Sequence, residues 1–469
     1  MTIYKLFDRS YRDYIGNSEL LRTLNIIILS AAVGQFLFVA QFGVAFTGFA
    51  STLGAGEFAF GVITALPVLA SLVQIPASYL AVRTGRFKRI FLIGGVVQRL
   101  SWIVIAFIPF LFYVPDTLWA LIVMVALASM SGSFVAITHM TLLGSVIPME
   151  IRGRYVATRQ KVIMAFALVA GLSIAFALDN IPGFWGYTIV FALGGIAGLA
   201  DILMYAKVSF SSIPKKDKNT PLHKGIKDCF KRPIMRNYLI FWTFWSFAIN
   251  ISAPFFNKYA IDVLGLSYVN LIIFGQIMSQ VMALLVISRW GVFLDRYGSV
   301  PTMLISGIVS TLVGFVWLFA VPGAIWPVLV FNMIGGMFWC ANDACMVNMQ
   351  LSHTPTEERS TSLAVYAVIT SLAAAAALIV GGAILEILSP IMEYLALTFA
   401  GTAFDHYKLI FLIALVLRLA VIGVFLPRVW NERELPLRTA YAKAYADISG
   451  RLRFEASRLR LPRFRRRRK

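Results

Sequence analysis

Charged residues are scarce in this chain of 469 residues, and long polar stretches are scarcer still. Only 14% of the residues are charged and 59% are hydrophobic, whereas soluble proteins have about 25% charged and about 45 to 50% apolar residues. Apolar runs of about 20 residues, each able to cross a hydrocarbon core of about 30 Å as a helix, recur along the chain. The composition excludes a large soluble domain and predicts an all-α membrane protein.

Other absences exclude classes of function. The chain has 3 cysteines, and they lack the CxxC or histidine spacing of a metal site. No GxxxxGK followed by Ser or Thr is present to bind ATP phosphates, and no nucleophile stands beside a base in a polar loop. A cleavable signal peptide is also lacking, since residues 1–22 are mixed and charged. We therefore expect no cofactor, no metal and no enzymatic activity.

Hydropathy predicts twelve spanning helices, divided into two sets of six by a polar central segment. The predicted spans are 24–49, 59–82, 90–113, 117–146, 156–178, 185–206, 238–261, 267–288, 300–320, 325–351, 362–388 and 408–427. The chain is thus divided into an N-terminal segment (1–23), a first bundle (24–206), a central loop (207–237), a second bundle (238–427) and a basic tail (428–469).

Positive charge predicts the orientation of these spans. Of the 42 Lys and Arg residues, 38 lie in the two terminal segments, in the connections that follow even-numbered spans, or in the first six residues of the fifth span. Lys and Arg concentrate in loops that remain in the cytoplasm. We therefore expect both termini in the cytoplasm and the protein in the cell membrane, plasma or inner.

The tail at 428–469 has 14 Lys and Arg residues against 4 acidic ones. Its last part mixes arginine with Leu and Phe, which suits an anionic membrane surface. A basic run attracts any polyanion, RNA included, but the juxtamembrane position favours lipid headgroups. We expect anionic lipids as partners of the tail and no nucleic acid.

Two pairs of motifs indicate an internal repeat. SYLAVRTG at 78–85 and GVFLDRYG at 291–298 lie 213 residues apart, each after the second span of its half. IPMEIRGR at 147–154 and TPTEERST at 354–361 share Pro-x-Glu-x-Arg, lie 207 residues apart and follow the fourth spans. Nearly equal offsets predict two copies of a six-helix unit in parallel topology.

With these motifs the chain resembles the major facilitator superfamily over about residues 20–428. The signature of that family, in the loop after the second helix of each half, is Gly-x-x-x-Asp-Arg-x-Gly followed by basic residues. Gly291, Asp295, Arg296 and Gly298 match the second-half copy.

The first-half copy departs from the signature. Ser78 and Val82 replace its first Gly and its Asp, while Arg83, Gly85 and Arg86 fit. The resemblance implies two six-helix bundles around a central cavity that opens to each side of the membrane in turn.

The signature residues also have an implied role. In the family this loop holds the halves together on the cytoplasmic side in one state and releases them in the other. By resemblance, Asp295 and Arg296 are conformational latch residues, because an Asp here can pair with Arg or with a helix N-terminus. Val82 then weakens the first-half latch. The alternative is that these residues only form a turn.

Four charged residues are predicted inside the membrane, Asp343 and three with a structural role, which are Arg99, Asp201 and Arg418. Arg99 and Arg418 each lie ten residues from the nearest basic flank, hence about 15 Å deep. The resemblance places the third, sixth, ninth and twelfth helices in an outer layer. We therefore expect Arg99 to pair with Asp201 on the sixth helix in a structural role, with a substrate or coupling role as the alternative.

Candidate substrate and coupling residues lie on helices that the resemblance assigns to the cavity. Asp343 on the tenth span and His139 on the fourth are predicted at similar depth, and both can exchange protons near neutral pH. A purely packing role is the alternative for each. Further candidates supply amides or an aromatic surface: Asn250, Asn257, Gln35, Asn342 and Trp339.

The sequence predicts a monomeric secondary transporter that moves a small-molecule substrate by alternating access, with protons as a candidate coupling ion. Within this class, the alternative is an exporter of amphipathic drugs or lipids. In another class, the alternative is a receptor or scaffold that transports nothing.

Overall fold

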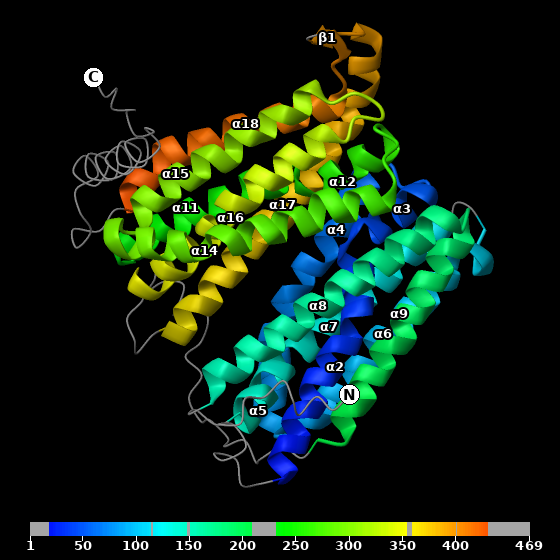
Figure 1. Cartoon of the computed structure of the whole chain (residues 1–469), viewed down its shortest axis with the longest axis vertical. Helices are drawn as coiled ribbons and strands as arrows, with labels where there is room; N and C mark the ends of the chain where they lie inside the picture. Colours follow the sequence, from blue (N-terminus) through cyan, green and yellow to red (C-terminus); the bar gives the residue numbers. More distant parts are fainter. Residues whose placement is uncertain are drawn as a thin grey trace, which may run out of the picture.

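The computed structural model describes residues 18–113, 116–147, 151–208, 231–353, 359–399 and 401–429. Within these ranges it has 12 helices long and apolar enough to cross a membrane, so the predicted helical membrane fold with twelve spans is confirmed. Figure 1 shows them as two elongated bundles. The Pro-x-Glu-x-Arg motifs, most of the central loop and the tail beyond residue 429 fall wholly or partly outside the described residues.

The first bundle holds the first six spans, one of which is assembled from shorter helices. Its elements are α2 (Ser18–Phe42), α3 (Val44–Thr52), α4 (Glu57–Ala70), η2 (Ser71–Val73), α5 (Gln74–Thr84), α6 (Phe87–Leu111), α7 (Asp116–Val146), α8 (Arg152–Asn180) and α9 (Phe184–Ala206).

The second bundle holds the other six spans and a short antiparallel hairpin that hydropathy did not predict. Its elements are α11 (Pro233–Asn250), α12 (Ala253–Asp262), α13 (Tyr268–Asn270), η3 (Leu271–Ile277), α14 (Met278–Tyr297), α15 (Ser299–Leu312), η4 (Val313–Phe319), α16 (Trp326–His353), α17 (Arg359–Leu395), β1 (Thr398–Phe399), β2 (Thr402–Ala403), α18 (His406–Phe425) and η5 (Leu426–Val429).

Two helix breaks coincide with Gly or Pro. α2 ends before Gly43, whose backbone is extended, and α3 resumes immediately after it. α11 ends at Asn250 and α12 begins at Ala253, with Pro254 in its first turn, where its missing N–H breaks no helical hydrogen bond. These interruptions free backbone groups within the membrane, which other side chains must satisfy.

The two signature motifs lie in helical turns, so the expectation that they form loops is wrong. α5 continues to Thr84 and α14 to Tyr297. Each helix ends only at the last glycine of its motif, where φ is positive, +67° at Gly85 and +88° at Gly298. Glycine reaches this region without the strain that a Cβ imposes, so it stops the helix there.

The bundles meet at one end of the molecule. There α4 packs along α17, and α3 packs on α12. A Cβ at Gly61 would lie 2.5 Å from the Leu378 carbonyl oxygen, so the two helix backbones approach directly. We call this region, which includes the start of α4 and the end of α12, the closed end. Figure 1 shows the bundles diverging from it toward α5 in one bundle and the far end of α14 in the other.

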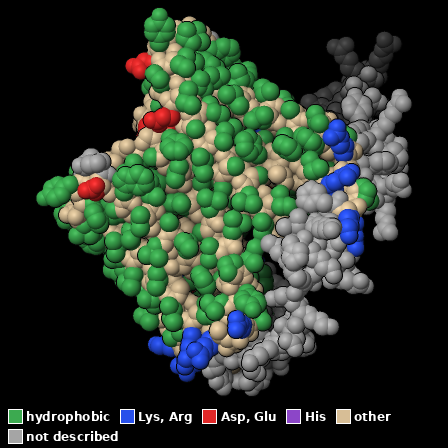
Figure 2. All heavy atoms as spheres, turned by 180° about the vertical axis from the view of Figure 1, so that it is seen from behind, with side chains coloured by type: hydrophobic (Ala, Val, Ile, Leu, Met, Phe, Trp, Pro, Cys, Tyr) green, Lys and Arg blue, Asp and Glu red, His purple; other side chains and the backbone are tan. Residues whose placement is uncertain are grey.

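Charge is segregated along the same direction. Figure 2 shows hydrophobic side chains over the middle of the molecule, Lys and Arg at two tips and acidic side chains at the opposite part. We call the end with Arg83, Arg86 and Arg296 the basic end. A hydrophobic belt between oppositely charged ends is the surface expected of a protein that spans a membrane.

Replacing Gly61 with valine will separate α4 from α17, because the added side chain meets backbone atoms that have no room to yield. We expect the closed end to open. Electron paramagnetic resonance of spin labels on Trp185→Cys and Trp326→Cys, in a variant without native cysteines, should report longer distances. Gly423→Val on α18 is the control, since a Cβ there meets nothing within 4 Å. An unchanged distance distribution in Gly61→Val would contradict the close-packing argument.

Candidate functional site

A polar cavity lies inside the first bundle, in the part bounded by α2, α6 and α7. It consists of two hollows of about 380 Å³ and about 290 Å³ that share several wall residues. The shared residues are Phe38, Gln41, Gln98, Arg99, Val135 and His139. The cavity therefore combines amide, guanidinium and imidazole groups inside the membrane, where polar groups usually serve function.

An ion pair joins α6 to α9 in the wall of this cavity. Arg99 Nη2 lies 3.1 Å from Asp201 Oδ2, and the two side chains are only 12% and 11% exposed. Ser30 donates to the other carboxylate oxygen at 2.6 Å. Gly34 and Gly198 leave the room that the pair occupies, since a Cβ at either would lie within 3 Å of Asp201 or Arg99. The pairing expected from the sequence is present, but it lines a cavity.

Further polar groups surround the pair. His139 Nε2 lies 2.7 Å from the Tyr205 hydroxyl, and the imidazole stacks on Phe91. Arg159 of α8 lines the same hollow, and its buried Nε has no hydrogen-bond partner. The sequence reasoning missed Arg159 and Tyr205. A signal existed for Tyr205, because it lies four residues after Asp201 and so shares its helix face.

A second cavity of about 420 Å³ lies beside the break between α11 and α12. Phe42 of the first bundle lines both this cavity and the polar one, so the two adjoin at the bundle interface. The wall of the second cavity is aromatic, with amides placed among the rings: Phe256, Asn257, Gln276, Trp317, Phe331, Asn332 and Trp339.

Arg418 also lines the second cavity. The residue is 5% exposed, and its guanidinium donates to the carbonyl oxygens of Ala248 and Ile249 and to Ser252 Oγ, at 3.2, 3.3 and 3.2 Å. These carbonyls end α11, where the helix dipole favours a cation. Arg418 thus satisfies the backbone freed by the helix break, and no acidic group of the described residues forms an ion pair with it.

The structure divides the predicted substrate and coupling residues into two groups. Gln35, His139, Asn257 and Trp339 line the cavities. Arg99, Asp201 and Arg418, predicted to be structural, line them too.

The other three candidates lie outside both cavities. Asn342 is buried and hydrogen-bonded to Ser306 and Ser310 of α15. Asn250 donates at 2.8 Å to the carbonyl oxygen one turn earlier in its own helix. Asp343 is exposed rather than enclosed, because it lies one turn beyond Trp339 toward the basic end, where the bundles have diverged.

Charged side chains join the bundles at the closed end. Lys258 of α12 lies 3.4 Å from Glu57 of α4 and 2.7 Å from Asp262 of its own helix. Ser51 of α3 donates to Asp262 at 2.9 Å, and Tyr407 donates to Glu57. We call these five residues the closed-end cluster. It exists only while the two bundles touch.

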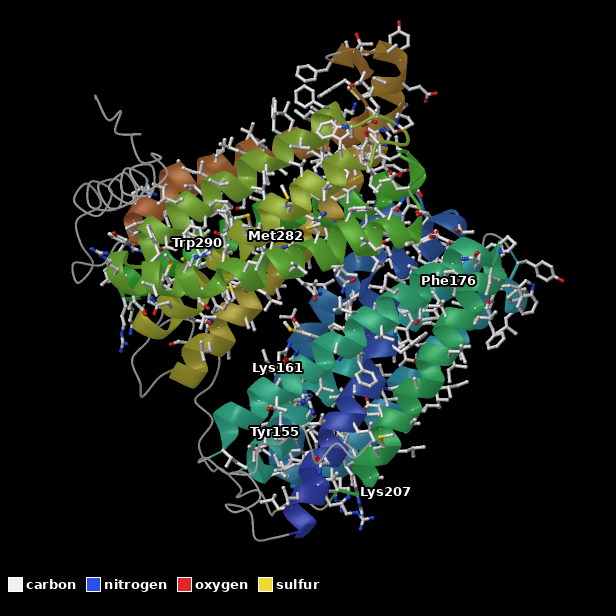
Figure 3. All side chains as sticks on the ribbon, in the orientation of Figure 1. Tyr155, Lys161, Phe176, Lys207, Met282 and Trp290 are labelled. Carbon is white, nitrogen blue, oxygen red and sulfur yellow. The ribbon has the colours of Figure 1, made fainter. Side chains whose placement is uncertain are left out.

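The latch residues lie at the open, basic end. Asp295, Arg83 and Arg86 are exposed, and the guanidinium of Arg296 lies 5.5 Å from the ring of Tyr297 within its own bundle. Figure 3 shows Lys207 and Trp290, near the basic ends of the two bundles, far apart. The latch contacts implied by resemblance therefore stay a prediction for the opposite conformation.

Within the described residues, no group of three or more His, Cys, Asp or Glu side chains is arranged to hold a metal ion. The cavities thus offer guanidinium, carboxylate, imidazole, amide and aromatic surface. These groups can bind a small polar solute and move protons, and the two-bundle frame can expose them to one side at a time.

Comparison with solved structures finds transporters of the same architecture. A point mutant of the nucleoside transporter NupG has a TM-score of 0.69 at 15% identity, covering 87% of this chain and 100% of that one. A D-xylose-proton symporter has 0.64 at 17%, covering 87% and 99%. A bacterial homologue of the human lysosomal transporter Spinster, inward-facing and occupied, has 0.63 at 13%, covering 91% and 100%.

At such identities these similarities show the fold alone. No curated protein matches the sequence. The family model described as Major Facilitator Superfamily matches residues 24–290 and again residues 279–464. Both halves of the chain are covered by these matches, in agreement with the repeat and the twelve spans, and the chain therefore belongs to the major facilitator superfamily of transporters.

Proposed function

We propose that this protein carries a small solute across the cell membrane by alternating access, coupled to protons. The basic end is assigned to the cytoplasm by the positive-inside rule, so the structure represents an inward-open state. The protein acts as a monomer, with anionic lipids at its basic tail. The two adjoining cavities form the solute site, and the closed-end cluster seals it from the other side.

The observation that carries proton coupling is the buried ion pair of Arg99 and Asp201 in the cavity wall. Protonation of Asp201 removes the charge that holds the Arg99 guanidinium, which then becomes available to the solute. Binding or release of a proton at Asp201 is thus accompanied by a change in the shape of the cavity. In this proposal His139, whose Nε2 contacts the Tyr205 hydroxyl, relays that proton, and exposed Asp343 is a second proton acceptor at the basic end.

Asp201→Asn tests the coupling, because it keeps the size and the Ser30 hydrogen bond but cannot lose a proton. Ligands are first found by thermal stabilisation of the purified protein. In proteoliposomes we expect Asp201→Asn to retain counterflow of the labelled solute and to lose accumulation driven by a pH gradient. Asp343→Asn is run in parallel to rank the two acids. Equal accumulation by wild type and Asp201→Asn would refute coupling at this pair, and absence of saturable flux in wild type would refute transport.

A further inference from the structure

The charged residues that line the two cavities are unequal in sign. Arg99, Arg159 and Arg418 supply three guanidinium groups, whereas Asp201 supplies the single carboxylate. A cleft with one sign of charge and walls of low dielectric concentrates the opposite charge. The described cavity walls therefore favour a negatively charged solute.

Two residues that line the second cavity have donors without acceptors. The hydrogen bonds of Arg418 within the described residues use Nε and Nη2 and go only to neutral oxygens, so Nη1 has no acceptor there. Trp317 lines the same cavity, and its indole Nε1 is buried without a hydrogen-bond partner. A buried guanidinium that lacks a counter-charge is unfavourable, and an anion that accepts from it would relieve the imbalance.

The remaining wall fits a flat ring. Phe256 lies 5.0 Å from Phe331 and 5.2 Å from Trp317, measured between ring centroids, and Trp317 lies 5.7 Å from Phe331. Aromatic groups stack or pack edge to face at such separations. A cavity of about 420 Å³ is within the size range of sites for small organic ligands.

We propose that the second cavity binds a small organic anion that carries a flat ring, with Arg418 as the anion-binding residue and the aromatic wall as the ring site. This inference rests on the proposed function and names its substrate class. Arg418 then has two roles, because the nitrogens that cap α11 leave one nitrogen for the ligand. Binding of the anion would couple solute occupancy to the helix break between α11 and α12.

The test compares ring carboxylates with their neutral amides, which have nearly the same shape. The pairs are benzoate and benzamide, nicotinate and nicotinamide, and phenylacetate and phenylacetamide, each titrated against the purified wild-type protein in detergent by thermal stabilisation. We expect at least one acid to bind roughly tenfold or more tightly than its amide, as for a hydrogen bond to a charged group. Amides that stabilise as well as the acids, or a panel in which no acid stabilises, would overturn the proposal.

Two variants localise the binding. Trp317→Phe removes the Nε1 donor together with the five-membered ring of the indole. We expect it to reduce the preference for the acid about tenfold, because an ionised acceptor gains more from a donor than a neutral amide does. Arg418→Lys keeps the charge and Arg418→Gln removes it, so the acid preference should fall in that order. Arg418 also caps α11, so binding to the two Arg418 variants is interpreted only if they elute as monodisperse protein. Trp317→Phe tests the anion site whether or not the Arg418 variants fold. Unchanged acid preference in Trp317→Phe would refute the site.

This outcome is distinct from that of the proposed function. Asp201 lies in the first bundle, and its test measures accumulation in a pH gradient. If Asp201→Asn abolishes accumulation while acids and amides bind alike, the result supports proton-coupled transport and refutes the anion site. If acids are preferred and Asp201→Asn accumulates normally, the anion site stands and the coupling proposal falls.

Discussion

Replacing Lys258 with methionine will open the closed end of the molecule. Lys258 is 5% exposed, and it contacts Glu57 of the first bundle and Asp262 of the second. Without its ammonium group, the closed state leaves the Glu57 carboxylate buried with only the Tyr407 hydroxyl as a partner. Removing one partner of a buried ion pair costs about 3 to 5 kcal/mol. Conformations in which the bundles separate hydrate Glu57 and avoid this cost.

The expected shift in the population of the closed state follows from this free-energy cost. Moving an equilibrium from 99:1 to 1:99 takes about 5.5 kcal/mol, so a loss of about 3 kcal/mol is expected to give a mixed population. Spin labels on Trp185→Cys and Trp326→Cys should show a second, longer distance at the closed end. Labels on Lys207→Cys and Arg289→Cys should show a shorter one at the basic end.

Lys408→Met is the matched control. Lys408 is also a buried lysine near the closed end, 1% exposed, but its ammonium donates to Thr402 and Ala403 of its own bundle, at 2.9 and 2.7 Å. Its loss lowers stability without favouring either conformation. If Lys258→Met and Lys408→Met give the same distance distributions as wild type, the closed-end cluster does not hold the bundles together.

The helical frame was predictable because a membrane leaves few alternatives. Apolar runs of the length that crosses a bilayer must be helical to satisfy their own backbone, and the two signature motifs fall at equivalent helix ends in both halves. Helix boundaries were less accurate where polar residues continue a helix. Asp295 and Arg296 read as a loop because they are charged, but the helix continues until Gly298, whose positive φ ends it.

The sequence predicted how deep the candidate site residues lie in the membrane, but not which way their side chains point. Spacing from the basic flanks placed Arg99 and Arg418 inside the membrane, and both are buried. Which way a side chain points around a nearly uniformly apolar helix depends on its neighbours. Asn342 and Asp343 are adjacent, yet the first is buried against α15 and the second is exposed. Arg159 was predicted to belong with the charges of the loop before it, because the start of α8 carries several basic residues.

Replacing Arg99 with methionine will cause a large loss of stability. Asp201 is 7% exposed, and in this variant only the Ser30 hydroxyl would still donate to its carboxylate. We expect the free energy of unfolding to fall by about 3 to 5 kcal/mol, as for other buried pairs that lose one partner. The measurement is a reversible SDS titration in mixed micelles. Arg289→Met, at an exposed position of α14, is the control and should stay within about 0.5 kcal/mol of wild type.

The double variant Arg99→Met with Asp201→Leu separates a charge effect from a packing effect. It removes both charges and fills the space between α6 and α9 with apolar groups, an exchange that is often neutral or stabilising for buried pairs. We expect it to be more stable than Arg99→Met alone and unable to accumulate solute in a pH gradient. A double variant no more stable than the single one would mean that Arg99 stabilises the bundle through packing of its side chain against Gly198. The two charged groups could then separate during transport at little cost in free energy.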